Sequence, residues 1–186
     1  MTINWKEKIK DHLNPLVLPI YAWYYGTFKG SNTFFFQKNK LKYFYHKANA
    51  TWTNERAIEI PIMCEHIKKH PNSRMLEIGN VLSHYFRMSH DVVDKYEKAP
   101  GVINQDVVEY TPDYCYDLII SISTLEHVGW DETPRDPEKI FLAIENLKKI
   151  LAPGGKLVIT LPIGENPALD SYLEKKEIKT MNQNQK

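Results

Sequence analysis

Apolar runs separated by polar turns and helical patterns dominate the chain from about residue 54 onward. The runs RMLEIG, HDVVDKY, GVINQDVV, YDLIISIS and KLVITLP are typical of strands, and the longer ones are apolar on both faces. Helical patterns lie before the first run and between the fourth and the fifth, and VLSHYFRM predicts a short helix after the first run. Strands that alternate with helices favour a mostly parallel sheet with helices on both faces.

The first helical pattern covers residues 54–69. Asn54 is expected to cap it, and Ile58, Ile62 and Ile67 are its apolar positions. Pro61 is expected to kink this helix or to lie in its first turn, because proline lacks the N–H that a helix interior needs. The sequence HPNS then ends the helix ahead of the first strand.

DPEKIFLAIENLKKIL is the clearest helical pattern of the chain. Asp136 is expected to cap it, and Pro137 suits its first turn. One apolar stripe runs along the helix, made of Ile140, Ile144, Leu147 and Leu151. The sequence APGG is expected to stop the helix before the last strand.

Two stretches depart from regular alternation. Asp94 and Val102 are only eight positions apart, which is shorter than the dozen or so residues of a normal parallel crossover. We therefore expect the third strand to be short, to lie at the sheet edge and to be joined by a loop. Little follows the last strand, and residues 171–186 predict a frayed helix and a polar tail.

Composition adds limits to this picture. The chain has 186 residues, 42% hydrophobic and 25% charged, which suits a globular domain with a core. A net charge of +1 gives no electrostatic argument for nucleic acid. Two cysteines form no disulfide framework, so we expect a reduced, cytoplasmic protein. The most apolar stretch, LNPLVLPIYAWYYG, is interrupted by Pro15 and Pro19 and is too short to span a membrane.

Residues 1–53 are rich in aromatic side chains. The simpler interpretation is a satellite lobe packed on the main domain, which we expect to cover residues 54–170. The alternatives are a lid over a substrate or a patch that contacts a membrane surface.

Polar residues stand where the predicted strands end. Glu77 and Gly79 close the first strand, Asp94 closes the second, Asp106 follows the third, and Ser123 to His127 close the fourth. In open parallel sheets, ligands bind at these carboxyl ends where the strand order reverses. Asp94 comes 17 residues after Glu77, close to the spacing of an acid that binds a ribose.

In this order, the segments LEIGN, DVVDKYE, INQDVV, YDLIISISTLEHVGWDE and LKKILAPGGKLVITLPIG resemble the class I S-adenosylmethionine-dependent methyltransferases. The resemblance implies a Rossmann-like α/β fold with about five visible strands, without the final hairpin of the family. It implies cofactor contacts by Glu77, Gly79 and Asn80 near the methionine part. It further places Asp94 at the ribose and Asp106 at the adenine amine, with Ser123, Glu126 and His127 lining the reacting side.

The first loop of the chain departs from the family pattern E/D-x-G-x-G-x-G. Gly79 is kept, while Val81 and Ser83 stand where further glycines are expected. We interpret it as a variant cofactor loop, because S-adenosylmethionine has no pyrophosphate to cradle. The same absence of glycines argues against a nicotinamide-dependent oxidoreductase.

The missing hairpin predicts a C-terminally shortened domain whose last strand pairs with another copy through its exposed edge.

His127 is the candidate general base, because its unperturbed pKa suits proton removal near neutral pH. The alternative is a histidine that only bonds the loop or the cofactor. Glu126 is expected to orient His127 or the substrate, and the loop GWDETPRDP to act as a lid. His66 and His70 with Cys64 suggest a metal cluster, but a solvated helix face explains them better, so no metal is predicted.

The expected function is S-adenosylmethionine-dependent methyl transfer to a small-molecule or sugar acceptor, at oxygen or nitrogen. The alternative is a truncated, non-catalytic domain that binds a ligand or a partner.

Overall fold

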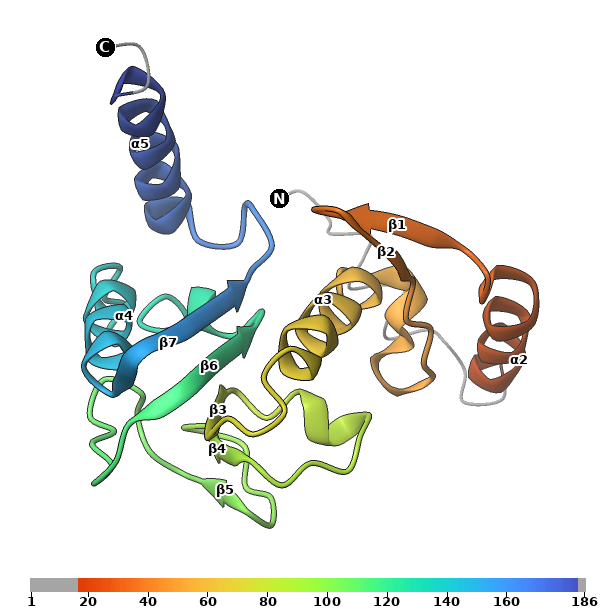
Figure 1. The fold of residues 1–186 in the computed structure, drawn as a ribbon, viewed down its shortest axis with the longest axis horizontal. Helices are drawn as coiled ribbons and strands as arrows, with labels where there is room; N and C mark the ends of the chain where they lie inside the picture. Colours follow the sequence, from red (N-terminus) through yellow and green to blue (C-terminus); the bar gives the residue numbers. More distant parts are fainter. Residues whose placement is uncertain (1–16, 184–186) are drawn as a thin grey trace. The chain divides into compact units, whose positions relative to one another are not determined.

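Figure 1 shows the computed structural model, which describes residues 17–183. The chain divides into two compact units, Met1–Glu65 and His66–Lys186. No helix among the described residues is long and apolar enough to cross a membrane.

The first unit is small and built around aromatic rings. Its elements are α2 (Leu18–Tyr24), the π-helix η1 (Tyr25–Lys29), the antiparallel hairpin of β1 (Thr33–Phe36) and β2 (Asn39–Lys42), and the 3-10 segment η2 (Ala48–Thr53). Tyr25 stacks on Trp52 with ring centroids 5.6 Å apart and also contacts Tyr45 at 5.2 Å. Tyr43 continues this cluster between Tyr45 and Phe34. These five rings, all partly buried, pack on one another in the lobe.

Helix α3 (Arg56–Lys68) begins after the predicted cap, since the side-chain oxygen of Asn54 accepts a hydrogen bond from the Arg56 N–H at 3.1 Å. Pro61 lies inside the helix. The predicted apolar stripe was wrong at Ile58, which is 40% exposed, whereas Ile60 and Met63 are fully buried. The helix carries apolar residues on most of its circumference, so periodicity does not choose the buried face.

The second unit contains a five-stranded parallel sheet in the order β5-β4-β3-β6-β7, with α4 packed against β7. Its strands are β3 (Met75–Ile78), β4 (Asp91–Val93), β5 (Val102–Ile103), β6 (Tyr116–Ile122) and β7 (Leu151–Thr160). The chain builds outward from β3 on one side and then crosses to β6 on the other. This order confirms the predicted Rossmann-like α/β sheet and puts its switch point between β3 and β6.

The two edges of the sheet follow the sequence prediction. Strand β5 has two residues, lies at one edge and is reached from β4 through a loop. Strand β7 forms the other edge and contains no fully buried residue. It starts earlier than predicted: Leu151 already pairs with Tyr116, and the Pro-Gly-Gly turn falls in an irregular stretch before Lys156 pairs with Leu118.

Two helix predictions need correction. Helix α4 (Lys139–Lys149) begins at Lys139, and its cap position is Glu138, without a side-chain cap bond. Asp136 instead accepts the Glu138 N–H in a local turn before the helix, at 3.1 Å. The predicted helix VLSHYFRM is reduced to a single 3-10 turn, η3 (Leu82–His84). The predicted stripe of α4 is confirmed at Ile140 and Leu147, which are fully buried, but was wrong at Leu151, which belongs to β7.

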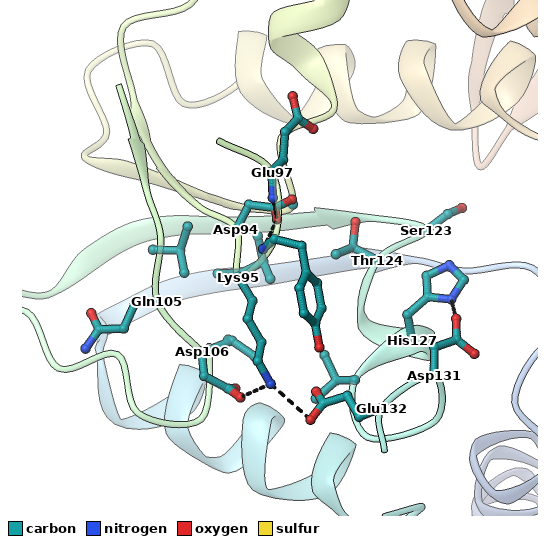
Figure 2. A pocket seen from close by; sticks show the side chains of 16 residues that line it. Asp94, Lys95, Glu97, Gln105, Asp106, Ser123, Thr124, His127, Asp131 and Glu132 are labelled. Carbon is teal, nitrogen blue, oxygen red and sulfur yellow. Dashed lines mark hydrogen bonds and ion pairs between the residues drawn. The ribbon is translucent and has the colours of Figure 1, made fainter. Parts of the chain in front are cut away.

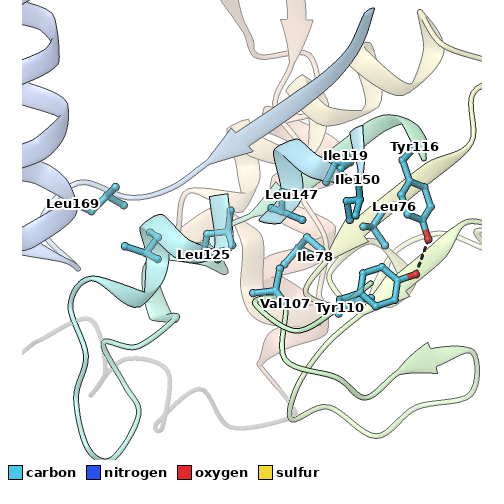
Figure 3. Packing of buried hydrophobic residues seen from close by; sticks show 13 residues of the cluster. Leu76, Ile78, Val107, Tyr110, Tyr116, Ile119, Leu125, Leu147, Ile150 and Leu169 are labelled. Carbon is cyan, nitrogen blue, oxygen red and sulfur yellow. Dashed lines mark hydrogen bonds between the residues drawn. The ribbon is translucent and has the colours of Figure 1, made fainter. Parts of the chain in front are cut away.

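The core of this unit lies between the sheet and α4 (Figure 3). Leu76, Ile119 and Leu147 are fully buried in it, and the Tyr110 and Tyr116 hydroxyls meet at 2.7 Å. Leu169, in the first turn of α5 (Pro167–Gln183), also belongs to this core. The start of α5 is therefore anchored, and the frayed tail from residue 171 stays a prediction.

Candidate functional site

A cavity of about 480 Å³ opens at the carboxyl ends of β3, β4 and β6. Figure 2 shows the polar side chains that line it, which come from the segments after β4 and β5, from the end of β6 and from the loop after β6. Five of the predicted site residues line it: Gly79, Asp94, Asp106, Ser123 and His127. Its position is the switch point of the sheet, where ligands of such folds bind. Glu77, Asn80 and Glu126 are buried beside the cavity without lining it.

Glu77 holds the loop that follows β3. Its side chain is fully buried, and Oε1 accepts the N–H groups of Val81 and Leu82 at 3.0 and 2.8 Å. Oε2 lies 2.6 Å from Nε2 of His90, the residue just before β4. Both carboxylate oxygens therefore have partners within the protein, and Glu77 acts on the cavity through the loop.

Gly79 brings the ends of β3 and β6 together. It has φ +85°, and a Cβ added there would come 2.2 Å from Oγ1 of Thr124. A side chain at this position is therefore excluded by contact as well as by backbone conformation. Ser123, at the end of β6, also has a positive φ of 39°. Strained residues of this kind often mark functional sites.

Asp94 organises the end of β4. Oδ1 accepts the N–H groups of Tyr96 and Glu97, both at 2.8 Å, and Oδ2 accepts that of Asn80 at 3.2 Å. The side-chain amide of Asn80 donates to Glu97 at 2.6 Å and reinforces the same loop. Among the described residues Oδ2 accepts this one bond, so it keeps a lone pair for a ligand hydroxyl.

Four charged side chains form a closed ring at one wall of the cavity. Oδ2 of Asp106 lies 2.9 Å from Lys95 and 2.6 Å from Lys139, and Glu132 contacts the same lysines at 3.0 and 2.6 Å. Burial raises the pKa of Asp106, but hydrogen bonds from Lys139 and Lys95 outweigh it and hold the pKa at about 2. The ring ties the loop after β6 to β4 and to α4.

Asp106 therefore has fewer free acceptor sites than the sequence suggested. Oδ1 accepts the Val108 N–H at 3.1 Å, while Oδ2 is shared by the two lysines. The adenine role of Asp106 stays a prediction. In the structure, Asp106 holds Lys95 and Lys139 in the charged ring.

His127 is paired with a carboxylate that the sequence analysis did not single out. Its Nδ1 lies 2.6 Å from Oδ2 of Asp131, one helical turn further along, and Nε2 lies 3.9 Å from Oε1 of Glu126. The His127 side chain is half exposed and lines the cavity. A carboxylate on Nδ1 fixes the tautomer with Nε2 unprotonated, which is the form a general base needs.

The residues that sequence reasoning missed are Lys95, Thr124, Asp131, Glu132 and Lys139. A usable signal existed only for Asp131, because His127 and Asp131 are four positions apart after a strand end. The members of the charged ring come from segments far apart in the sequence, so no local pattern predicts that they meet.

Acidic side chains outnumber basic ones among the residues that line the cavity. Five carboxylates line it, those of Asp94, Glu97, Asp106, Asp131 and Glu132, against the single ammonium group of Lys95. Lys139 also neutralises part of the ring, and Asp94, Glu97 and Asp131 remain outside it. Such a wall favours a ligand that carries positive charge.

Metal ligands do not cluster in the part of the chain that the structure describes: no group of three or more His, Cys, Asp or Glu is placed to hold an ion. In the predicted histidine pair, the ring nitrogen Nδ1 of His70 hydrogen-bonds the backbone oxygen of His66 at 2.7 Å.

Two solved structures to which this chain is similar are methyltransferases. N-methyltransferase NodS from Bradyrhizobium japonicum WM9, in complex with S-adenosyl-L-homocysteine, is 20% identical over 62% of this chain and 71% of its own, with a TM-score of 0.38. The sugar N-methyltransferase KedS8 from Streptoalloteichus sp ATCC 53650 is 15% identical over 72% of this chain and 58% of its own, with a TM-score of 0.41.

A scan against protein-family models found no match to the chain, and a search of curated proteins found none either. TM-scores below 0.5 say nothing about substrate, so any function has to be argued from the residues of this chain.

Proposed function

We propose that the protein transfers a methyl group from S-adenosylmethionine to a small-molecule or glycan acceptor, at oxygen or nitrogen. One observation carries the proposal: Gly79, Asp94 and His127 come from three separate strand ends and line one cavity at the switch point of a parallel sheet. This is the order that the resemblance to class I methyltransferases requires.

The cavity residues suit the chemical parts of this cofactor. The free lone pair on Oδ2 of Asp94 can accept a ribose hydroxyl. The acidic wall complements the sulfonium and ammonium charges of S-adenosylmethionine. A volume of about 480 Å³ lies within the range of cofactor and ligand sites.

When bound, the cofactor supplies an electrophilic methyl group, and the protein has to orient the acceptor and remove its proton. In our proposal, Nε2 of His127 takes up the proton of the acceptor. The Asp131 carboxylate at Nδ1 favours the tautomer in which Nε2 carries no proton. Asp131 acts as a positioning residue. The backbone oxygen of Glu126 accepts a hydrogen bond from the Asn166 side chain at 3.0 Å, so this part of the loop is fixed to the segment before α5.

Calorimetry with S-adenosylmethionine and S-adenosylhomocysteine tests the cofactor. We expect saturable binding by the wild type and an affinity about 10-fold to 100-fold lower for Asp94→Asn, since hydrogen bonds to charged groups contribute about 1.5–3 kcal/mol. Asp113→Asn, on an exposed carboxylate outside the cavity, is the matched control and should bind like the wild type. Absence of binding at millimolar ligand would rule the proposal out.

The non-catalytic alternative predicts a different result. A domain that keeps the cofactor without turnover would bind both ligands and would transfer no methyl group to a panel of amino and hydroxyl sugars. Transfer of a labelled methyl group to any member of that panel, lost in His127→Ala, would favour the enzyme.

A further inference from the structure

The helical segment 18–29 in the first unit contains no buried residue, although most of its side chains are apolar or aromatic. Ile20 and Trp23 are each 63% exposed and Phe28 is 59% exposed. Monomeric proteins seldom leave several large apolar side chains uncovered in one place, and such patches mark contact surfaces.

These side chains form one continuous patch. The Phe28 ring lies 5.7 Å from that of Trp23 and 5.4 Å from that of Tyr24, centroid to centroid. Ile20 precedes Trp23 and Tyr24 by about one helical turn and so shares their side of the helix. Tyr25, by contrast, faces the ring cluster inside the lobe. The lobe thus has an aromatic interior and a second, outer aromatic set that the interior does not use.

The sequence that contains this patch, residues 17–54, carries only positive charge. Residues 17–54 contain five lysines and no aspartate, glutamate or arginine; the lysines are Lys29, Lys38, Lys40, Lys42 and Lys47. In the hairpin, exposed Lys40 pairs across the strands with Phe35, which is 74% exposed. Residues 55–186, in contrast, hold 16 basic and 21 acidic side chains. The charge of the chain is therefore segregated, even though its total is +1.

We propose that the N-terminal lobe docks on a lipid bilayer that carries anionic headgroups, through the outer aromatic patch and the lysines of residues 17–54. Tryptophan and tyrosine prefer the boundary between headgroups and acyl chains, and lysines reach anionic phosphates with flexible stems. Neither feature alone is enough, and their combination is the usual requirement for stable peripheral binding.

Other occupants fit the surface less well. A nucleic acid would match the lysines, but it offers no apolar environment for Ile20, and the stretch lacks arginine, which commonly reads bases and phosphates. A second copy of residues 17–54 would bring five lysines, with no acidic side chain among these residues, against the same five lysines. An anionic bilayer satisfies both the apolar and the charged part.

Vesicle flotation of the full chain tests the proposal, with phosphatidylcholine vesicles compared with vesicles that also contain phosphatidylglycerol. The wild type should float with the anionic vesicles only, and salt should weaken the binding. Lys38→Gln, Lys40→Gln and Lys42→Gln combined should reduce partitioning about 100-fold, at about fivefold for each lysine near the surface. Trp23→Ser combined with Phe28→Ser should reduce it at least 10-fold.

Two control variants in the second unit match these changes in chemistry. Leu142→Ser removes an exposed apolar side chain and Lys156→Gln an exposed lysine, and both should leave partitioning unchanged. Circular dichroism of each variant verifies that it folds. Equal flotation with neutral vesicles, no flotation with either, equal losses in the control variants, or binding to single-stranded DNA in place of vesicles would each overturn the proposal.

Discussion

Nε2 of His90 and Oε2 of Glu77 lie 2.6 Å apart, and both side chains are buried between neighbouring parallel strands. The carboxylate accepts, so the imidazole donates from Nε2. The other Glu77 oxygen accepts two backbone N–H groups of the loop after β3. A buried side-chain pair therefore shapes a loop in which the class I methyltransferase sequence pattern has more glycine.

His90→Ala should destabilise the fold, because it leaves one oxygen of a buried carboxylate without its donor. We expect the free energy of unfolding to fall by about 1–3 kcal/mol in urea denaturation. His90→Gln, which can still donate, should recover part of this loss. His84→Ala, on a half-exposed histidine of the same region, is the control. Equal losses for His84→Ala and His90→Ala would contradict a special role of the buried pair.

Gly79→Ala and Gly101→Ala separate backbone strain from steric contact. Both glycines have φ near +85°, but a Cβ at Gly101 meets nothing within 4 Å, whereas at Gly79 it meets Thr124. Gly101→Ala should cost about 1–2 kcal/mol through left-handed strain alone. Gly79→Ala should cost more and should also weaken S-adenosylhomocysteine binding in calorimetry. Unchanged binding in Gly79→Ala would mean that the loop does not approach the ligand.

Asp106 makes stability depend on pH in the acid range. Its pKa is about 2 in the folded protein against an ordinary value of 3.8, so the unfolded chain takes up the proton first as the pH falls. Its stabilising contribution is complete above pH 3.8 and is lost as the pH drops toward about 2. In this pH window, the midpoint temperature of unfolding should depend less on pH in Asp106→Asn than in the wild type. Asp113→Asn should keep the wild-type dependence.

His127→Ala should lower methyl transfer by about 10²–10⁴-fold, because it removes the general base, with S-adenosylhomocysteine affinity nearly unchanged. Asp131→Asn should lower kcat with cofactor affinity nearly unchanged, since it alters the partner of Nδ1. Glu126→Gln should be milder than His127→Ala. Equal loss of cofactor affinity in His127→Ala would reassign this residue to cofactor binding.

The open edge of β7 predicts self-association through strand pairing. Among the described residues, this strand is the edge of the sheet next to β6, and Leu157 and Ile159 on it are only partly buried. Edges of this kind pair with other chains unless something covers them. We expect light scattering to show a mass that rises with protein concentration, and a constant monomer mass at high concentration would refute it.

Local sequence patterns were enough to predict the sheet and the place of the cavity at its strand ends. Strand runs and helices alternate on a scale of a few residues, and an eight-position gap fixes a loop between β4 and the short edge strand. Parallel strands bring their carboxyl ends to one side of a sheet, so Gly79, Asp94 and His127 had to meet there. These are local patterns combined with one rule of topology.

Which of the predicted side chains are free to act depends instead on contacts between distant segments. Glu77 hydrogen-bonds His90, 13 positions away, and Asp106 hydrogen-bonds Lys139, 33 positions away. Such pairs depend on strand register and on where a helix starts, and α4 starts later than its sequence suggested. Exposure of the aromatic side chains of α2 was equally hidden, because apolar composition does not tell a surface patch from an interior.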